Sequence, residues 1–199
     1  MEINKTLTKI HETTWLGSSD QCYQVMYTVA RTFQVKSVLE IGTHQGASAI
    51  TFCQAILDNN YIPELTTVDS WIGVPNQPDT EEQKLAMKNR ALNFFKEAKF
   101  DKYIEMIEGD SKVVLSGIFQ KIGKVDLCFI DGNHEYDYVI SDFENCKNFT
   151  DIILLHDTAK GNLKYPDYIK NQGWTVITFP TRYLEGQGQL IGISLAIKP

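Results

Sequence analysis

Short apolar runs rich in β-branched residues alternate with longer segments of helical periodicity along this chain. The runs that fit strands stand, in order, at 35–41, 65–68, 103–107, 125–130, 152–155, 175–179 and 191–197. The helical patterns between them cover 47–57, 81–99, 111–120, 136–149 and 165–172. Because strands that alternate with helices pair in parallel and are covered on both faces, the pattern predicts a doubly wound, Rossmann-like α/β sheet.

The two ends of the chain add a helix and a hairpin to this prediction. Apolar residues at helical spacing from Cys22 to Ala30 predict a helical cap within residues 1–34, ahead of a core over 35–199. The last two strands are expected to pair as a hairpin, because the segment between them is short and carries Gly186 and Gly188. No repeat or linker divides the 199 residues, so we expect one domain.

Composition excludes several classes of partner. The chain has 19 basic and 25 acidic residues, a net charge of −6, and no basic stripe that would bind a nucleic-acid backbone. It has no apolar run near the ~20 residues that span a bilayer and no signal-like start, so we expect a cytoplasmic protein without a membrane partner. The widely spaced cysteines predict buried, reduced thiols: Cys22, Cys53, Cys128 and Cys146.

Polar residues gather at the point where each of the first five strands ends. In chain order they are Glu40 to Gly46, Asp69, Gly109 to Ser111, Asp131 to His134, and His156 with Asp157. Because ligands of open parallel sheets bind beyond the carboxyl ends of the strands, these residues predict a ligand crevice.

The residues after the first two strands favour one ligand. Gly42 and Gly46 allow close approach of the backbone, and the helix that follows directs its amides toward a ligand. Asp69 can accept hydrogen bonds from both hydroxyls of a ribose. Glu40 would repel a pyrophosphate but attract a cationic sulfonium with an amino group, and the G-x-G-x-x-G fingerprint is absent. These features favour S-adenosylmethionine over NAD.

The chain also resembles a known family over about residues 35–197. The ordered strings VLEIGTHQGASAI, TVDSW, EGDS, DLCFIDGNHEYDYVISDFE and IILLHD resemble the class I S-adenosylmethionine-dependent methyltransferases. Within that class they resemble the small-molecule and sugar O-methyltransferases, such as the macrocin and cephalosporin-cluster enzymes. The resemblance implies a seven-stranded sheet in the order 3-2-1-4-5-7-6 with an antiparallel last strand. It also implies methyl transfer to a small hydroxylated acceptor.

The resemblance assigns cofactor-binding roles to several positions. The positions that match the segment around the methionine and sulfonium are Glu40, Gly42, Thr43, Gly46 and Ser48. The positions that match contacts to the nucleoside are Asp69 for the ribose, Ser70 and Trp71 beside the adenine, and Asp110 and Ser111 at the adenine edge. Asp131 is counted with them because it borders the cofactor. The chain departs from the family at 148–151, where Asn-Phe-Thr-Asp replaces the usual Pro-Gly-Gly.

The resemblance also implies a base and a metal site. His134 stands where catechol-type relatives carry a catalytic lysine, and histidine can accept a proton near neutral pH. Asp131, His156 and Asp157 match three ligand positions of metal-dependent relatives. Because His156 brings an imidazole, Mn²⁺, Zn²⁺ and Fe²⁺ are candidates beside Mg²⁺. The alternative is a site without metal, in which His134 and His156 act as bases.

Other functions are open at this stage. One is a catalytically silent module that binds S-adenosylmethionine as a scaffold; an oxidoreductase and a nucleic-acid methyltransferase are disfavoured, since neither motif is present. The expected partner is a small-molecule acceptor, selected by the N-terminal cap and the loops at 71–80 and 183–189, and a homodimer is an option that the sequence leaves open. His44 is expected in a turn or surface role, and Asp142 is expected to be solvated or to cap a helix.

Overall fold

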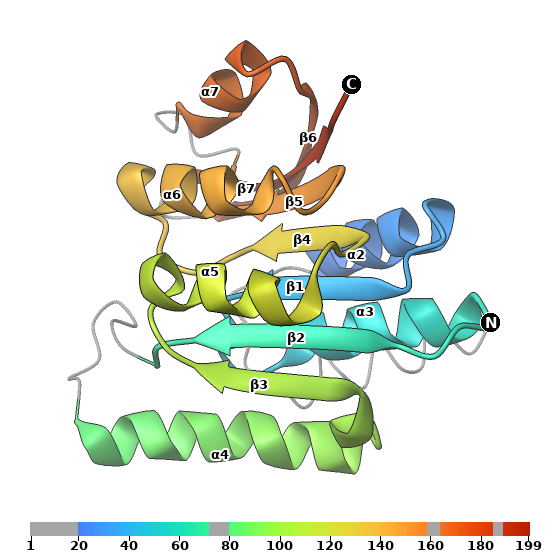
Figure 1. Ribbon diagram of the computed structural model, residues 1–199, viewed down its shortest axis with the longest axis vertical. Helices are drawn as coiled ribbons and strands as arrows, with labels where there is room; N and C mark the ends of the chain where they lie inside the picture. The colour runs from blue at the N-terminus through green and yellow to red at the C-terminus, as the bar shows by residue number, and fades with distance from the viewer. Residues whose placement is uncertain (1–19, 72–79, 159–163, 185–188) are drawn as a thin grey trace.

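The computed structural model describes residues 20–71, 80–158, 164–184 and 189–199. Its strands are β1 (Ser37–Ile41), β2 (Glu64–Asp69), β3 (Ile104–Glu108), β4 (Leu127–Ile130), β5 (Ile152–His156), β6 (Thr175–Leu184) and β7 (Gln189–Ile197). They form one sheet in the order β3-β2-β1-β4-β5-β7-β6 (Figure 1). The first five strands are parallel, and β7 runs antiparallel to both β5 and β6. The predicted fold class, strand order and antiparallel last strand are confirmed.

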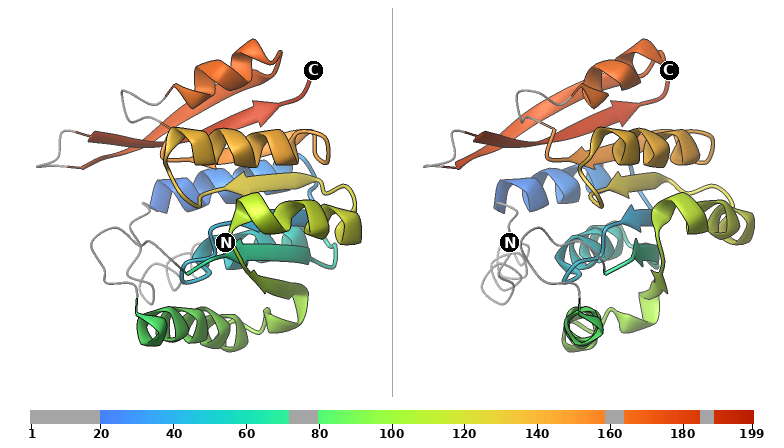
Figure 2. Two further views of the ribbon diagram at one scale, coloured as in Figure 1. Left: turned by 60° about the vertical axis from the view of Figure 1, so that its left-hand side comes forward. Right: turned by 90° about the vertical axis from the view of Figure 1, so that its left-hand side faces the viewer.

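Helices cover both faces of the sheet (Figures 1 and 2). One apolar core contains residues of α2 (Asp20–Thr32), α3 (Ala47–Asp58) and α4 (Glu81–Glu97). The other core contains residues of α5 (Ser111–Ile122), α6 (Tyr136–Cys146) and α7 (Tyr165–Asn171), and a 3₁₀ turn, η1 (Asp101–Tyr103), precedes β3. None of the described helices is both long and apolar enough to cross a bilayer.

Strand β4 shows why the central runs are apolar without alternation. Its side chains at Leu127 and Phe129 belong to the first core, whereas Cys128 and Ile130 belong to the second. All four are at most 2% exposed, because successive side chains of a strand point to opposite faces and both faces are covered. The four cysteines are buried and free of disulfides, as expected.

The strand boundaries differ from the predicted ones where side chains or turns take over the backbone hydrogen bonds. Strand β1 begins two residues later than predicted, because the Asp126 carboxylate accepts from the amides of Lys36 and Ser37. Strand β6 runs past Pro180 to Leu184, because an irregular register at Pro180 and Arg182 accommodates the missing amide of proline. The predicted loop tip at 185–188, most of the loop at 71–80 and the first 19 residues of the cap lie outside the described residues.

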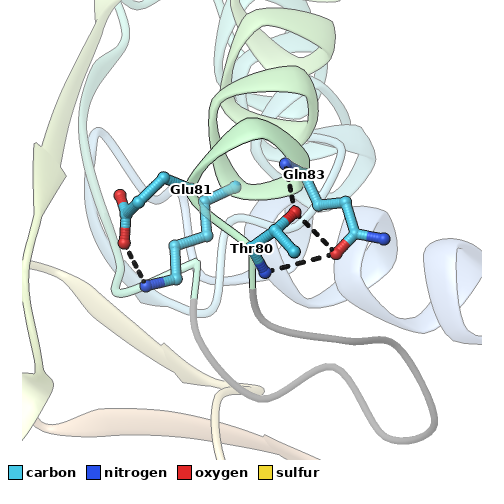
Figure 3. Close-up of polar contacts among 4 residues, drawn as sticks. Thr80, Glu81 and Gln83 are labelled. Atoms are coloured by element: carbon cyan, nitrogen blue, oxygen red, sulfur yellow. Dashed lines mark hydrogen bonds and ion pairs between the residues drawn. The ribbon is translucent and has the colours of Figure 1, made fainter.

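Helix α4 begins with a capping box and lies beside β3 (Figures 1 and 3). The Thr80 hydroxyl accepts from the amide of Gln83 at 3.2 Å, and the Gln83 side chain accepts from the amide of Thr80 at 3.3 Å. Leu85 stands at helical spacing with Leu92 and Phe95, which predicts a place on the apolar face, but it is 57% exposed. Ala91 and Phe95 are the buried residues of the helix, and Met87 and Phe94 pack partly buried against the same core, so the contact with the core begins one turn into the helix, beyond Leu85.

Candidate functional site

The turn between β1 and α3 packs too closely for side chains at its two glycines. Gly42 and Gly46 have φ angles of +99° and +85°. A Cβ atom at Gly42 would lie 2.2 Å from the carbonyl oxygen of Asp131, and one at Gly46 would lie 2.2 Å from the ring of Phe95. The turn is therefore held between the end of β4 and helix α4, at the carboxyl edge of the sheet.

Gly46→Ala should destabilise the protein, because the new Cβ meets the Phe95 ring and the backbone is left-handed. Overpacking of this kind costs about 1–3 kcal/mol in unfolding free energy, and the left-handed conformation adds about 1–2 kcal/mol. The matched control is Gly117→Ala in α5, where an added Cβ meets nothing within 4 Å and alanine favours the helix by about 0.5–1 kcal/mol. Urea unfolding of both variants measures the difference; equal stabilities would show that α4 does not constrain the turn.

Asp69 ties this turn to the end of β2. Its two carboxylate oxygens accept hydrogen bonds from the backbone amides of His44 at 2.8 Å and Trp71 at 2.7 Å. Burial raises the pKa of Asp69, and these amide donors oppose the shift. Because each carboxylate oxygen has two lone pairs, the side chain retains acceptor capacity for ligand hydroxyls. The predicted ribose acid thus lies at the carboxyl edge, in contact with the glycine turn.

Glu40 is a fully buried carboxylate at this edge. Its Oε2 accepts a hydrogen bond of 2.5 Å from the Thr67 hydroxyl, which in turn lies 2.6 Å from the hydroxyl of Thr43. Its Oε1 is buried and has no hydrogen-bond partner among the described residues. Burial raises the pKa of Glu40 to about 8, although the neighbouring hydroxyls of Ser48 and Thr67 lower it. A buried acceptor without a partner is costly, so this oxygen calls for a donor from a ligand.

The predicted adenine-edge residues have structural partners as well. Asp110 caps α5 by accepting from the amide of Lys112 at 2.9 Å, and Ser111 is buried at the first turn of that helix. The expectation that Asp142 is solvated was wrong, because α6 packs this residue against Ser111 with no exposed surface. Burial raises the pKa of Asp142 to about 6, and the Ser111 hydrogen bond opposes the shift.

Trp71 is buried in this structure, with 3% of its surface exposed and a left-handed backbone. Its indole nitrogen has no hydrogen-bond partner among the described residues. Ser70, beside it, is half-buried. Packing against the first core accounts for Trp71 in this structure, and adenine stacking stays a prediction.

The predicted base and metal positions come together at the ends of β4 and β5. The strands pair Ile130 with Leu155, so Asp131, the first residue after β4, lies beside His156, the last residue of β5. His156 Nδ1 lies 3.0 Å from Asp131 Oδ1 and 3.4 Å from Oδ1 of Asp157. Burial alone would lower the pKa of His156, but Asp131 raises it well above its usual value through charge and hydrogen bonding.

His134 lies on the open side of this cluster. Its Nε2 is 3.7 Å from Oδ2 of Asp157, and its side chain is 41% exposed, whereas that of Asp157 is 10% exposed. The histidine can therefore meet a molecule from solvent while a mostly buried carboxylate stands behind it. This arrangement suits proton transfer to an imidazole that has a carboxylate nearby.

The arrangement of these side chains does not fit a metal ion. In the described ranges, no group of three or more histidine, cysteine, aspartate or glutamate side chains is placed to hold one. His156 Nδ1 faces the carboxylates of Asp131 and Asp157, and the same nitrogen cannot both donate to them and coordinate a cation. The three predicted ligands lie close together, but His156 contacts Asp131 and Asp157 with the nitrogen that a cation would need.

Two residues of this region were not predicted to lie at the site. His44 has a left-handed backbone, and its side chain is near Asp69, Asp131 and Arg90; burial lowers its pKa. The position of His44 between Gly42 and Gly46 was the sequence feature that could have placed it at the site. Cys22 of α2 is fully buried and hydrogen-bonds the side chain of His156, a contact that no local pattern announces.

Comparison with known families agrees with this site. Residues 39–158 match a family model described as a methyltransferase domain, and they include the glycine turn, Asp69, Asp131, His134, and the pair His156 and Asp157. This chain belongs to the methyltransferase domain family. The family segment thus begins in β1 and ends just beyond β5. A curated relative, the "Uncharacterized protein y4gI" of Sinorhizobium fredii, is 28% identical over 132 residues. That match covers 62% of this methyltransferase-domain chain and 13% of the relative.

Solved methyltransferases share the fold at low sequence identity. An O-methyltransferase from Bacillus cereus in complex with S-adenosylhomocysteine matches with a TM-score of 0.71 and 14% identity, over 98% of this chain and 91% of that one. The O-methyltransferase of tomaymycin synthesis from Streptomyces achromogenes, in complex with S-adenosylmethionine, matches with a TM-score of 0.68 and 15% identity. The match covers 99% of this chain and 89% of that one. A Podospora anserina methyltransferase bound to S-adenosylhomocysteine matches with a TM-score of 0.62 and 17% identity, over 99% of this chain and 87% of that one.

Proposed function

We propose that this methyltransferase-domain chain transfers the methyl group of S-adenosylmethionine to a hydroxyl of a small acceptor. The observation that carries the proposal is Oε1 of Glu40, a fully buried carboxylate oxygen without a hydrogen-bond partner among the described residues. The ammonium group of the cofactor is a donor of the right charge for it. Asp69 stands at the neighbouring strand end, joined to the same turn through the amide of His44. Solved structures of the same fold are bound to this cofactor or its product.

The residues of the chain divide the proposed reaction between them. Glu40, Thr43, Gly42, Gly46 and Ser48 would hold the amino-acid end of the cofactor, and Asp69 its ribose. Ser70, Trp71, Asp110 and Ser111 would surround the adenine. The sulfonium supplies an activated methyl group, so the remaining work is to orient the acceptor hydroxyl and to remove its proton. His134 would accept that proton, with Asp157 behind it at 3.7 Å and Asp131 beside the cofactor.

The finer assignments belong to the same proposal. Similarity of the IDGNHEYD and LLHD strings supports the branch of small-molecule and sugar O-methyltransferases, such as the macrocin and cephalosporin-cluster enzymes. A silent scaffold is the second candidate, but no observation favours it over the convergence of His134 with Asp157. The one-domain organisation, the cytoplasmic location and the state of assembly stay predictions.

Asp69→Ala should weaken binding of S-adenosylhomocysteine by about 10–150-fold, measured by isothermal titration calorimetry. The reason is the loss of hydrogen bonds to a charged acceptor, which contribute about 1.5–3 kcal/mol. Asp126→Ala is the matched control, because Asp126 also accepts from two backbone amides but lies before β4, at the opposite edge of the sheet. Its affinity should stay at the wild-type value. No binding by the wild-type protein would contradict the proposed function itself.

A further inference from the structure

The residues that end β4 and β5 form a connected chain of side-chain contacts. His156 stands in the middle, with Nδ1 at 3.0 Å from Asp131 and 3.4 Å from Asp157. Asp157 uses its other carboxylate oxygen toward His134, at 3.7 Å. A displacement of the His156 ring would therefore change the position of the carboxylate that stands behind His134.

Contacts behind the cluster fix the His156 ring. The side chain is 7% exposed, its ring meets that of Phe129 edge to face at 6.4 Å, and the Cys22 thiol of α2 hydrogen-bonds it. Cys22 has no exposed surface. Helix α2 thus reaches the site through a buried contact between residues that are distant in sequence.

The backbone of Asp157 is held in an unusual conformation. Its φ is +57°, a left-handed value that is rare for residues other than glycine, asparagine and aspartate. The Tyr165 hydroxyl donates to its carbonyl oxygen at 3.1 Å, and the next amide, of Thr158, donates to Gly192 at 3.0 Å. Conformations of this kind persist where the surroundings over-determine them, and they concentrate at functional sites.

We propose that His156, held by Cys22, is a positioning residue that ties Asp131 to Asp157 and takes the place that a divalent cation would occupy at this edge. An N–H donor between two carboxylate side chains links them as a bridging cation would. The inference rests on the proposed function only for the role of His134. The link from Cys22 through His156 to Asp131 and Asp157, called the His156 clamp below, is tested by two measurements that need neither an acceptor nor turnover.

The first measurement is Mn²⁺ binding by electron paramagnetic resonance, with saturating S-adenosylhomocysteine. Wild type should bind Mn²⁺ no more tightly than His156→Asn, which retains an N–H donor. His156→Asp should bind at least about tenfold more tightly, because three carboxylates form the oxygen-donor set that Mn²⁺ and Mg²⁺ prefer. Saturation of wild type at micromolar Mn²⁺, lost in His156→Asn, would make His156 a metal ligand and overturn the proposal.

The second measurement is the ¹⁵N spectrum of the imidazole groups, assigned with His156→Asn. Wild type should show a protonated Nδ1 for His156, and Cys22→Ala should shift both His156 and His134 resonances. Cys53→Ala is the matched control, since Cys53 is equally buried in the same core and should leave both unchanged. Equal spectra for Cys22→Ala and wild type would show that Cys22 does not hold His156 in place and would overturn the His156 clamp. Retained binding of S-adenosylhomocysteine in these variants keeps that result separate from failure of the proposed function.

Discussion

His134→Ala should lower kcat by about 10²–10⁴-fold while leaving the affinity for S-adenosylhomocysteine unchanged. The expectation follows from position: the imidazole is 41% exposed, lies 3.7 Å from Asp157 and makes no contact with Glu40 or Asp69 among the interactions described above. Removal of the side chain leaves the cofactor contacts intact but removes the acceptor of the proton. A hydroxyl that keeps its proton is a poor nucleophile toward the methyl group.

The assay is methyl transfer from radiolabelled S-adenosylmethionine to a panel of small hydroxylated compounds, with binding measured separately by calorimetry. Glu135→Gln serves as the control, because Glu135 neighbours His134 but its side chain makes no capping hydrogen bond to α6. That variant should turn over normally. Near-normal kcat for His134→Ala would show that the base is another group, and a joint loss of binding and turnover would show that His134 belongs to the cofactor site.

Glu40→Gln should make the ligand-free protein more stable at pH 8 and bind S-adenosylhomocysteine about 10–150-fold more weakly. The unfolded chain ionises this carboxyl near pH 4.5, whereas the folded, ligand-free chain keeps the proton until about pH 8. The folded state therefore binds more protons between these values, and its stability falls as pH rises, by roughly 1.4 kcal/mol per pH unit from this group. A neutral amide removes that dependence, but it also removes the charge that would attract the ammonium of the ligand.

Urea unfolding across pH 4.5 to 8 tests this prediction, using the difference between variant and wild type. The raised pKa of His156 also makes stability fall as pH rises above the ordinary range of histidine, but it is present in both proteins and cancels in the difference. The two stabilities should converge near pH 4.5 and diverge toward pH 8. A constant difference in unfolding free energy over this range would mean that the Glu40 carboxyl is ionised throughout. The surrounding residues would then have to stabilise the buried charge.

The gathering of the site was predictable because the carboxyl ends of parallel strands share one edge. Glu40, Asp69, Asp131 and His156 each stand at a strand end that the apolar pattern marks, so the sheet order alone brings them together. The patterns that failed concern single side chains on helices. Leu85 lies at helical spacing but in the first turns of α4, where it is exposed, and Asp142 is polar but buried against Ser111 of α5.

Contacts between distant segments were the other limit. The Cys22 to His156 contact joins the first described helix to β5, and neither residue's neighbours in sequence indicate it. The start of β1 likewise depends on Asp126, which stands just before β4 and accepts from two amides of another segment. The use of His156 Nδ1 toward carboxylates, in place of a metal, could not be read from residue types, since the same three side chains suit both arrangements.

The late position of β7 in the chain has a consequence for biosynthesis. Strand β5, which carries His156, gains its second neighbour only when residues 189–197 insert between it and β6. On the ribosome, Ile153 and Leu155 therefore belong to an apolar strand with one open edge, which other nascent chains can pair with. Mutations in β7 should therefore lower the yield of folded protein more than similar mutations in β3.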